Sequence, residues 1–555
     1  MRMSNVIFLF SRLPLDKPKT SDKLSALCNE LLPDNIEPNS IHHTVNVNNF
    51  SAWAISVDHS TFKRSSDSVL AGVIFESPDF DWTIPGADRP DGSYAIFRSN
   101  EEEVEFISDD SGSRTIWYYS DNDYIIGSTS QLAIIRYLGT FDFDENVIPW
   151  MLSSGTLGPT LSWDKRLNRL PAAASIRCRR NYWLPDVKYS EPNFSVIERR
   201  YEDNSKILEE ELRKVTNFLV NLDWTKWALP LSGGYDSLAI LCFLSEVIPD
   251  RDVLQAITWG AQDSINERGN DAYVAAELAK QLRVKHRFYE TDSSCEEPEQ
   301  ILDRFVFCSE GRIDHISGYT DGMAIWNTLL ESGYTGIVRG DEGFGWVAVF
   351  NDQQARMSVG CSMCEDFLNL EHLSHTVGLP TQTLPDHLER ASNESIAAWR
   401  DRLYHSYRIS VVLGALSDIK LSYIEQINPL LSGRILNFIR SLSEELRTEK
   451  KLFKELIEKI SPPVSFASKA AVMPAGNVLR QKRFLRYILS TLQSDFAYCH
   501  FGADLPREIV RMCFNREAMK AVKINSYREK KFVLSPEVLA FRKFLIIKTL
   551  QLFRN

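Results

Sequence analysis

Six consecutive residues combine the groups that bind a phosphate chain: Ser232-Gly233-Gly234-Tyr235-Asp236-Ser237. Paired glycines let the backbone turn tightly and present its amides, and a helix starting there adds the partial positive charge of its N-terminus. Ser232 and Ser237 can donate to phosphate oxygens, whereas Asp236 would repel a bare phosphate and therefore implies a bridging Mg2+. An ordinary glycine-rich turn is the alternative, but the whole string favours a pyrophosphate site. The chain has no GxxxxGK[ST] sequence, which excludes an ordinary P-loop.

A second acidic string, Arg339-Gly340-Asp341-Glu342-Gly343-Phe344-Gly345, follows the apolar stretch TGIVR. Ligands of parallel α/β sheets lie beyond the carboxyl ends of the strands, so both strings are expected to face one crevice. Asp236 and Asp341 would then share one Mg2+, with an acidic surface turn as the alternative for the second string. The residues predicted to bind ATP are Leu231, Ser232, Gly233, Gly234, Tyr235, Asp236, Ser237, Thr258, Gly340 and Asp341.

The elements that must position these strings alternate between strand and helix. Strands are predicted at Trp227–Leu231, Val253–Trp259, Lys285–Glu290 and Thr335–Arg339, and helices at Leu238–Ile248, Asp271–Leu282 and Met323–Leu330. This alternation predicts a parallel sheet with right-handed crossovers. From about Gln353 onward the chain is expected to be mainly helical.

The first ~190 residues are expected to be mostly strands, because apolar and polar residues alternate in several short stretches. Examples are Gly92–Phe97, Glu103–Ser108 and a hairpin over Thr115–Ser128. A linker near Ser190 leads into an amphipathic helix over Asn204–Leu222. Near the other end, Ser535-Pro536-Glu537 predicts a helix start. That helix is expected to dock on its own domain; binding to a membrane surface or a partner is the alternative.

Composition excludes several classes of protein. The chain has 555 residues, with 63 Lys and Arg against 74 Asp and Glu, a net charge of -11. This acidity argues against partners such as nucleic acid or an anionic membrane. No apolar run reaches the ~18 residues of a spanning helix. Nine cysteines without framework spacing are typical of reduced thiols, so a cytoplasmic location is expected.

The two strings also carry a family resemblance. Ser232–Ser237 resembles the pyrophosphate loop of ATP pyrophosphatases, and Asp341–Gly345 resembles the second acidic motif of the asparagine synthetase family. Glu425–Leu431 is similar to that family's glutamate-arginine-proline segment, although Gln426 and Ile427 stand where the arginine is usual. Val464–Lys469 has the spacing of the segment that carries the family's catalytic lysine, without the usual preceding arginine.

The N-terminal part resembles the same family, with Asp91–Ala95, Asp110–Arg114 and Arg169–Ala172 in the family's order. The resemblance implies a mixed α/β and α+β protein: a degenerate class II glutamine amidotransferase-like domain (1–190), an α-β-β-α sandwich; an ATP-binding synthetase domain (204–500) with a parallel sheet; and a helical extension (501–555). The sequence begins Met1-Arg2-Met3-Ser4, and its first cysteine is Cys28, so glutamine hydrolysis is not expected.

The resemblance implies an ATP-dependent ligase that adenylates a carboxylate and couples it to an amine. Glu425 would orient or deprotonate the amine, with Tyr404 or Tyr407 as its partner, and Lys469 would stabilise the developing negative charge. For Glu425 and Lys469 an ordinary surface residue is the alternative. The expected reaction is macrolactam closure of a lasso-type precursor peptide, which would bring in a leader-peptide protease or recognition protein. A small-molecule carboxylate is the first alternative, and a non-catalytic binding scaffold the second.

Overall fold

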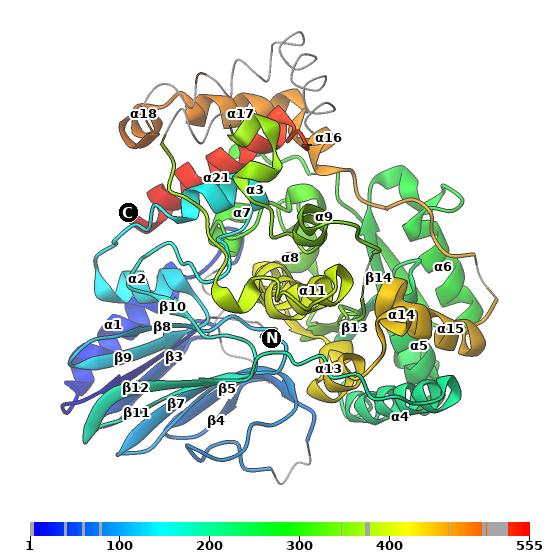
Figure 1. Ribbon diagram of the computed structural model, residues 1–555. Coiled ribbons are helices and arrows are strands. Elements are labelled where there is room, and N and C mark those ends of the chain that lie inside the picture. Colours follow the sequence, from blue (N-terminus) through cyan, green and yellow to red (C-terminus); the bar gives the residue numbers. More distant parts are fainter. Residues whose placement is uncertain are drawn as a thin grey trace.

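The computed structural model describes residues 5–37, 42–57, 61–76, 80–292, 294–345, 347–371, 378–463, 465–501, 507 and 531–554. These residues form three β-sheets, two antiparallel and one parallel (Figure 1). The predicted mixed α/β architecture is therefore confirmed. Much of the predicted C-terminal extension, between 502 and 530, lies outside the described residues.

The N-terminal part is a sandwich of the two antiparallel sheets. The first sheet has the order β10 (Asn168–Arg169), β8 (Trp117–Ser120), β9 (Tyr124–Ser128), β1 (Val6–Ser11), β3 (Ser51–Ile55) and β2 (Thr44–Val47). The second has the order β12 (Tyr182–Tyr189), β11 (Ala174–Arg179), β7 (Glu103–Ser108), β6 (Gly92–Ser99), β5 (Ser68–Ile74) and β4 (Lys63–Arg64). Alternating side chains such as Phe8, Phe97 and Phe106 fill the space between the sheets.

The predicted four-layer sandwich is found only in part. Helices α1 (Lys17–Glu30) and α2 (Gln131–Leu138) cover the outer face of the first sheet. Among the described elements, the outer face of the second sheet has a loop instead of helices, and Phe80 and Trp82 pack there on Tyr94 and Ile96. Two large aromatic side chains bury the apolar face that a second helical layer would otherwise cover.

The parallel sheet has the order β15 (Lys285–Glu290), β14 (Gln255–Gly260), β13 (Trp227–Pro230), β16 (Gly336–Val338) and β17 (Glu425–Ile427). Every neighbouring pair in it is parallel, as the alternating pattern predicts. On β13, Trp227 and Leu229 face one apolar core while Ala228 faces the other, so the sheet is buried on both sides.

Helices cover both faces of this sheet. One core includes residues of α4 (Tyr201–Leu219), α5 (Tyr235–Val247), α6 (Asp271–Leu282), α13 (Gly433–Arg440) and α15 (Lys451–Ile460). The other core includes residues of α7 (Pro298–Ser309), α8 (Ala324–Glu331), α11 (Ile396–Leu403) and α12 (Gly414–Leu421), and it continues into the N-terminal sandwich. The two halves therefore share a buried interface.

The region after β16 is mainly helical, as predicted. It includes α9 (Asp352–Ser358), the π-helix η7 (Tyr404–Leu413), α14 (Glu444–Arg447), α16 (Ala475–Leu479), α17 (Lys482–Leu492) and α18 (Asp495–Phe501). Helix α21 (Pro536–Arg554), red in Figure 1, packs on α3 (Val147–Ser154), α7 and α17. Its side chains Leu545 and Ile546 are fully buried, so the helix docks within this chain; its contacts extend beyond the expected domain to α3 of the N-terminal part. Within the described residues, no helix has the length and apolar character needed to cross a membrane.

Candidate functional site

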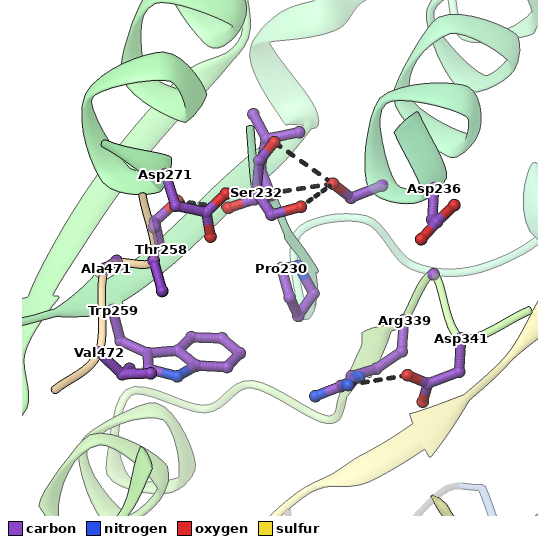
Figure 2. A pocket seen from close by; sticks show the side chains of 14 residues that line it. Pro230, Ser232, Asp236, Thr258, Trp259, Asp271, Arg339, Asp341, Ala471 and Val472 are labelled. Atoms are coloured by element: carbon purple, nitrogen blue, oxygen red, sulfur yellow. Dashed lines mark hydrogen bonds and ion pairs between the residues drawn. The ribbon is translucent and has the colours of Figure 1, made fainter. Parts of the chain in front are cut away.

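A crevice of about 310 Å³ lies where the strands β13, β14 and β16 end. Its walls include seven of the predicted nucleotide-binding residues: Leu231, Ser232, Asp236, Ser237, Thr258, Gly340 and Asp341. The prediction that the two strings face one crevice is confirmed. Figure 2 shows Asp236 and Asp341 on one side of the pocket, and Asp271, Thr258 and Trp259 on the other.

Two serines fix the shape of the first loop. The backbone N–H of Ser232 donates to Ser237 Oγ over 3.0 Å, and the two hydroxyls lie 2.9 Å apart. Helix α5 begins at Tyr235, three residues earlier than its apolar pattern predicts, and Gly234 is its N-cap. Asp236 therefore lies in the first turn, where the helix dipole favours negative charge.

Two glycines allow the crevice to close this tightly. A Cβ atom on Gly233 would lie 2.6 Å from Ala467 Cβ, and one on Gly340 would lie 2.9 Å from the backbone nitrogen of Ser237. Such distances are shorter than real contacts, so a side chain at either position would force the surrounding segments apart. Gly340 thus brings the second acidic string against the start of α5.

An unpredicted residue, Asp271, occupies the anion-binding side of the loop. Its Oδ1 accepts a hydrogen bond from the Gly233 N–H over 2.7 Å, and its side chain lines the cavity. Burial raises the pKa of Asp271, while the bond from Gly233 opposes the shift. The contact shows that this amide is available to an anionic oxygen, and a phosphate using it must take the place of Asp271.

A second unpredicted residue, Lys450, joins the acids of the two strings. Its Nζ lies 2.8 Å from Asp236 Oδ2 and 2.8 Å from Glu342 Oε1. Glu449 and Lys450 both have left-handed backbone angles, φ 55° and 60°, which place Lys450 at the start of α15. Non-glycine residues adopt this conformation only where the surroundings impose it, a feature that clusters at functional sites.

These charges shift one another's proton affinities. Burial raises the pKa of Asp236, and the carboxylate of Asp341 adds to the shift, while Lys450 opposes it. Burial also raises the pKa of Glu342 to about 7, with Lys450 opposing the shift. Burial alone would lower the pKa of Lys450, but Glu342 and Asp236 outweigh it and the net shift is upward. The lysine is therefore fully charged at neutral pH.

Asp236 and Asp341 are carboxylates of the kind that hold a divalent cation, and the Mg2+ site stays a prediction. Asp341 Oδ1 accepts from Arg339 Nη2 over 2.9 Å, and both side chains line the cavity with Asp236. Burial is the main cause of the raised pKa of Asp236, and a divalent cation shared by the two carboxylates would relieve the smaller repulsion from Asp341. Within the described residues no group of three or more potential metal ligands occurs, so phosphate oxygens would have to complete the coordination.

Three of the predicted nucleotide-binding residues, Gly233, Gly234 and Tyr235, are not among the residues that line the crevice. Tyr235 stacks on Phe466 with ring centroids 3.7 Å apart and donates to Glu458 Oε1 over 2.6 Å. Gly233 and Gly234 form the loop but are not among the lining residues. Thr258, which does line the cavity, donates to the Leu231 carbonyl over 2.6 Å and so joins the ends of β13 and β14.

The segment around Lys469 runs beside the crevice. The Ala467 N–H donates to the Gly233 carbonyl over 3.0 Å, and the Asp271 N–H donates to the Lys469 carbonyl over 2.8 Å. Ala470, Ala471 and Val472 line the cavity, but the Lys469 side chain is 58% exposed and forms an ion pair with Glu267. Its catalytic role stays a prediction, and using it requires the side chain to leave Glu267.

Glu425 lies away from the crevice. It begins β17 opposite Gly336, at the amino end of the sheet, whereas Arg339 to Asp341 follow the carboxyl end of β16. Its fully buried carboxylate forms an ion pair with Arg114 of the sandwich and accepts from Thr61 Oγ1 over 2.9 Å. The structure therefore does not bring Glu425 to the other predicted site residues, and its catalytic role stays a prediction.

The tyrosines predicted as partners of Glu425 both lie on η7. The Tyr404 hydroxyl donates to the Glu342 carbonyl over 3.2 Å, and the Tyr407 hydroxyl lies 2.6 Å from Thr156 Oγ1. Tyr404 thus supports the second acidic string. The sequence has no pattern that marks Lys450, which is one lysine in a charged stretch. Asp271 begins a predicted helix and could have been proposed as a site residue from that position.

Comparison with known proteins adds no identification, because neither a family model nor a curated protein sequence matches the chain.

Proposed function

We propose that this protein is an ATP-dependent ligase that forms an acyl-adenylate, releases pyrophosphate and transfers the acyl group to an amine. One observation carries the proposal: the Ser232–Ser237 loop opens α5 at the carboxyl ends of β13 and β16, where its Asp236 lines one crevice with Asp341 and forms an ion pair with Lys450. A helix N-terminus, hydroxyl donors, two carboxylates and a lysine are together the groups that can bind a pyrophosphate with its magnesium ion.

The residues of the crevice suit pyrophosphate departure. Ser232, Ser237 and the amides of the loop donate to its oxygens, and Lys450 supplies a fixed positive charge beside Asp236. Asp236 and Asp341 would hold Mg2+, which when bound would supply positive charge to the departing pyrophosphate. The substrate carboxylate attacks the α-phosphorus, and the bond between the α- and β-phosphates breaks, giving the acyl-adenylate.

The second step needs groups that orient the amine and stabilise the tetrahedral intermediate. Lys469 is one candidate, since its backbone is bound to Asp271 at the crevice edge. Glu425 is retained as the proposed base only on the family resemblance, because its carboxylate is held by Arg114. Proximity of the amine to the adenylate supplies a large part of the acceleration in such reactions.

The proposed substrate is a lasso-type precursor peptide whose side-chain carboxylate is joined to its own α-amine, and this part rests on the resemblance alone. A small-molecule carboxylate with a free amine or ammonia is the alternative. The products separate the two, because ring closure of a peptide changes its mass by the loss of one water.

The test is nucleotide turnover by the full chain. With Mg2+, ATP and a pool of candidate peptides and small carboxylates, we expect AMP and pyrophosphate, and exchange of labelled pyrophosphate into ATP that depends on the carboxylate. Asp236→Asn is the negative control. Release of ADP and orthophosphate would contradict the proposal, and a failure to bind ATP would favour the binding scaffold.

A further inference from the structure

A second cavity, of about 330 Å³, lies between the N-terminal sandwich and η7 and shares no lining residue with the crevice. Its walls come from the loop before β8, the segment Asn168–Ala173, the end of β12 with the linker after it, η7 and α13. Volumes of 300–1,000 Å³ are usual for small-molecule sites. Segments far apart in the sequence therefore build a separate pocket of ligand size.

Two arginines line this cavity without an acidic partner. Arg169 Nη2 donates to the Pro159 carbonyl over 2.7 Å, and Arg440 donates to His405 Nδ1 over 3.2 Å and to Asn437 Oδ1 over 3.0 Å. Within the described residues neither forms an ion pair with a carboxylate. Burial lowers the pKa of each arginine to about 10, because the charged guanidinium loses solvation in the protein.

Two carboxylates also line the cavity. The charge of Asp110 acts on Arg440 and opposes the downward shift of its pKa, but within the described residues neither carboxylate forms an ion pair with Arg169 or Arg440. Asp110 pairs with Arg89 over 2.6 Å. Glu191, on the exposed linker, accepts a hydrogen bond from the Tyr189 hydroxyl at 3.5 Å. Counting Arg89, Arg169 and Arg440 against Asp110 and Glu191 leaves one positive charge in excess. Carboxylates and phosphates are the ligand groups that an arginine binds through two parallel hydrogen bonds.

The remaining walls are amphipathic. Val187, Pro171 and Leu388 are apolar, while Ser406 and Ser410 offer hydroxyls from η7. A pocket with an apolar wall and a localised positive end suits an organic acid with an apolar body. It suits an inorganic anion less well, because such an ion would leave the apolar wall without a partner.

One histidine connects this cavity to the crevice. His405 lines the cavity, its Nε2 lies 2.7 Å from the Gly343 carbonyl, and its Nδ1 faces Arg440. Since Arg440 can only donate, Nδ1 is the acceptor and Nε2–H donates to Gly343. Gly343 belongs to the string that carries Asp341, so a ligand on Arg440 would act on that string through one side chain.

We propose that this cavity is a binding site for a small organic carboxylate with an apolar body, held by Arg169 and Arg440. The inference goes beyond the proposed ligase activity and does not depend on it.

Calorimetry on the full chain without nucleotide tests the proposal, with N-acetyl-L-phenylalanine and its neutral amide as matched probes. We expect saturable binding of the acid, and binding of the amide at least about tenfold weaker. Arg169→Gln and Arg440→Gln should each weaken binding of the acid by about tenfold or more. Lys188→Gln is the control, because it removes an exposed charge beside the cavity without altering its lining.

Equal binding of acid and amide, or no saturable binding of the acid, would overturn the proposal. Unchanged affinity in folded Arg169→Gln protein would do the same. Saturating Mg2+ and ATP should not displace the probe, whereas displacement would place the probe in the crevice. If the arginine variants do not fold, the comparison of the two probes and the ATP competition on the unaltered chain still decide. Failure of ATP turnover alone would contradict only the proposed function.

Discussion

The crevice and the interface between the two halves both contain buried charges, but they balance them differently. At the interface, Glu425 and Arg114 are almost fully buried and form an ion pair through Arg114 Nη2. In the crevice, Lys450 is shared by two acids, and Asp236 keeps 30% of its side chain exposed. The buried ion pair between Glu425 and Arg114 joins the two halves of the protein. The carboxylate of Asp236 is partly exposed, so a ligand in the crevice can reach it. The following predictions test this contrast, beginning with the largest expected effect.

Removing either crevice carboxylate should abolish turnover. Asp236→Asn and Asp341→Asn are each expected to lower carboxylate-dependent pyrophosphate exchange at least about 100-fold, the usual scale for losing one electrostatic contact in a transition state. Asp236→Asn weakens the ion pair with Lys450 and Asp341→Asn the one with Arg339, so thermal unfolding should confirm that each variant is folded at the assay temperature. Asp186→Asn on exposed β12 is the control. Normal exchange in either variant would remove the shared metal from the proposal.

Breaking the interface pair should instead cost stability. Glu425→Gln leaves the buried Arg114 charge without its carboxylate, and we expect a loss of about 3–5 kcal/mol in the free energy of unfolding. Denaturation with urea measures it, and Glu→Gln preserves the size of the side chain. Should the variant lose activity with unchanged stability, Glu425 acts in catalysis and the contrast between the two regions is wrong.

The interface should also respond to pH through Asp91, which is 8% exposed and accepts from the Gly433 N–H over 2.7 Å. Burial raises its pKa to about 6, above the unfolded value of about 4. The folded state therefore holds the proton more tightly, so this residue's contribution to stability falls as pH rises from about 4 to 6, by up to about 3 kcal/mol.

The measurement for Asp91 compares urea denaturation of the unaltered chain and of Asp91→Asn at pH 4.5 and 7.5. The asparagine cannot ionise, so the variant should lose less stability than the parent over this interval. An identical pH dependence in both proteins would show that Asp91 does not carry the effect.

The close contact of the crevice loops predicts a smaller effect. Gly233→Ala puts a methyl group against Ala467 and Val274, at a cost of about 1–3 kcal/mol, and should weaken ATP binding by shifting the loop. Gly476→Ala in α16 is the matched control, because nothing lies within 4 Å of its added Cβ. If both variants bind ATP equally, the tight packing of the loop is not needed for binding.

Lys469→Met should have the smallest effect on stability, because the ion pair with Glu267 is exposed and screened by solvent. Thermal unfolding measures this. If Lys469 moves into the crevice during the reaction, turnover falls while ATP binding persists. Glu267→Gln is the companion variant, since freeing the lysine should leave turnover intact or raise it; loss of turnover in Glu267→Gln would contradict this account.

Local pattern predicted the elements around the crevice well. Asp271–Leu282 and Lys285–Glu290 have the predicted bounds, because their periodicity and capping residues lie within a few positions of one another. Helix α5 starts three residues before its apolar pattern indicates, since its first turn lies inside the glycine loop and shows no such pattern. The missing helical layer of the sandwich was also invisible, because Trp82 replaces it from a loop.

The sequence by itself determined the two motifs Ser232–Ser237 and Arg339–Gly345 and the alternation of strands and helices. These predict the crevice that Asp236 and Asp341 line. Only the tertiary structure decided that Lys450 and Asp271 join them, that Glu425 pairs with Arg114, and that Arg169 and Arg440 line the same second cavity. The physical reason is the distance over which each effect acts: backbone propensity and side-chain periodicity depend only on residues a few positions apart along the chain. Charge pairing depends on distances in space, and Lys450 and Asp236 are 214 residues apart along the chain.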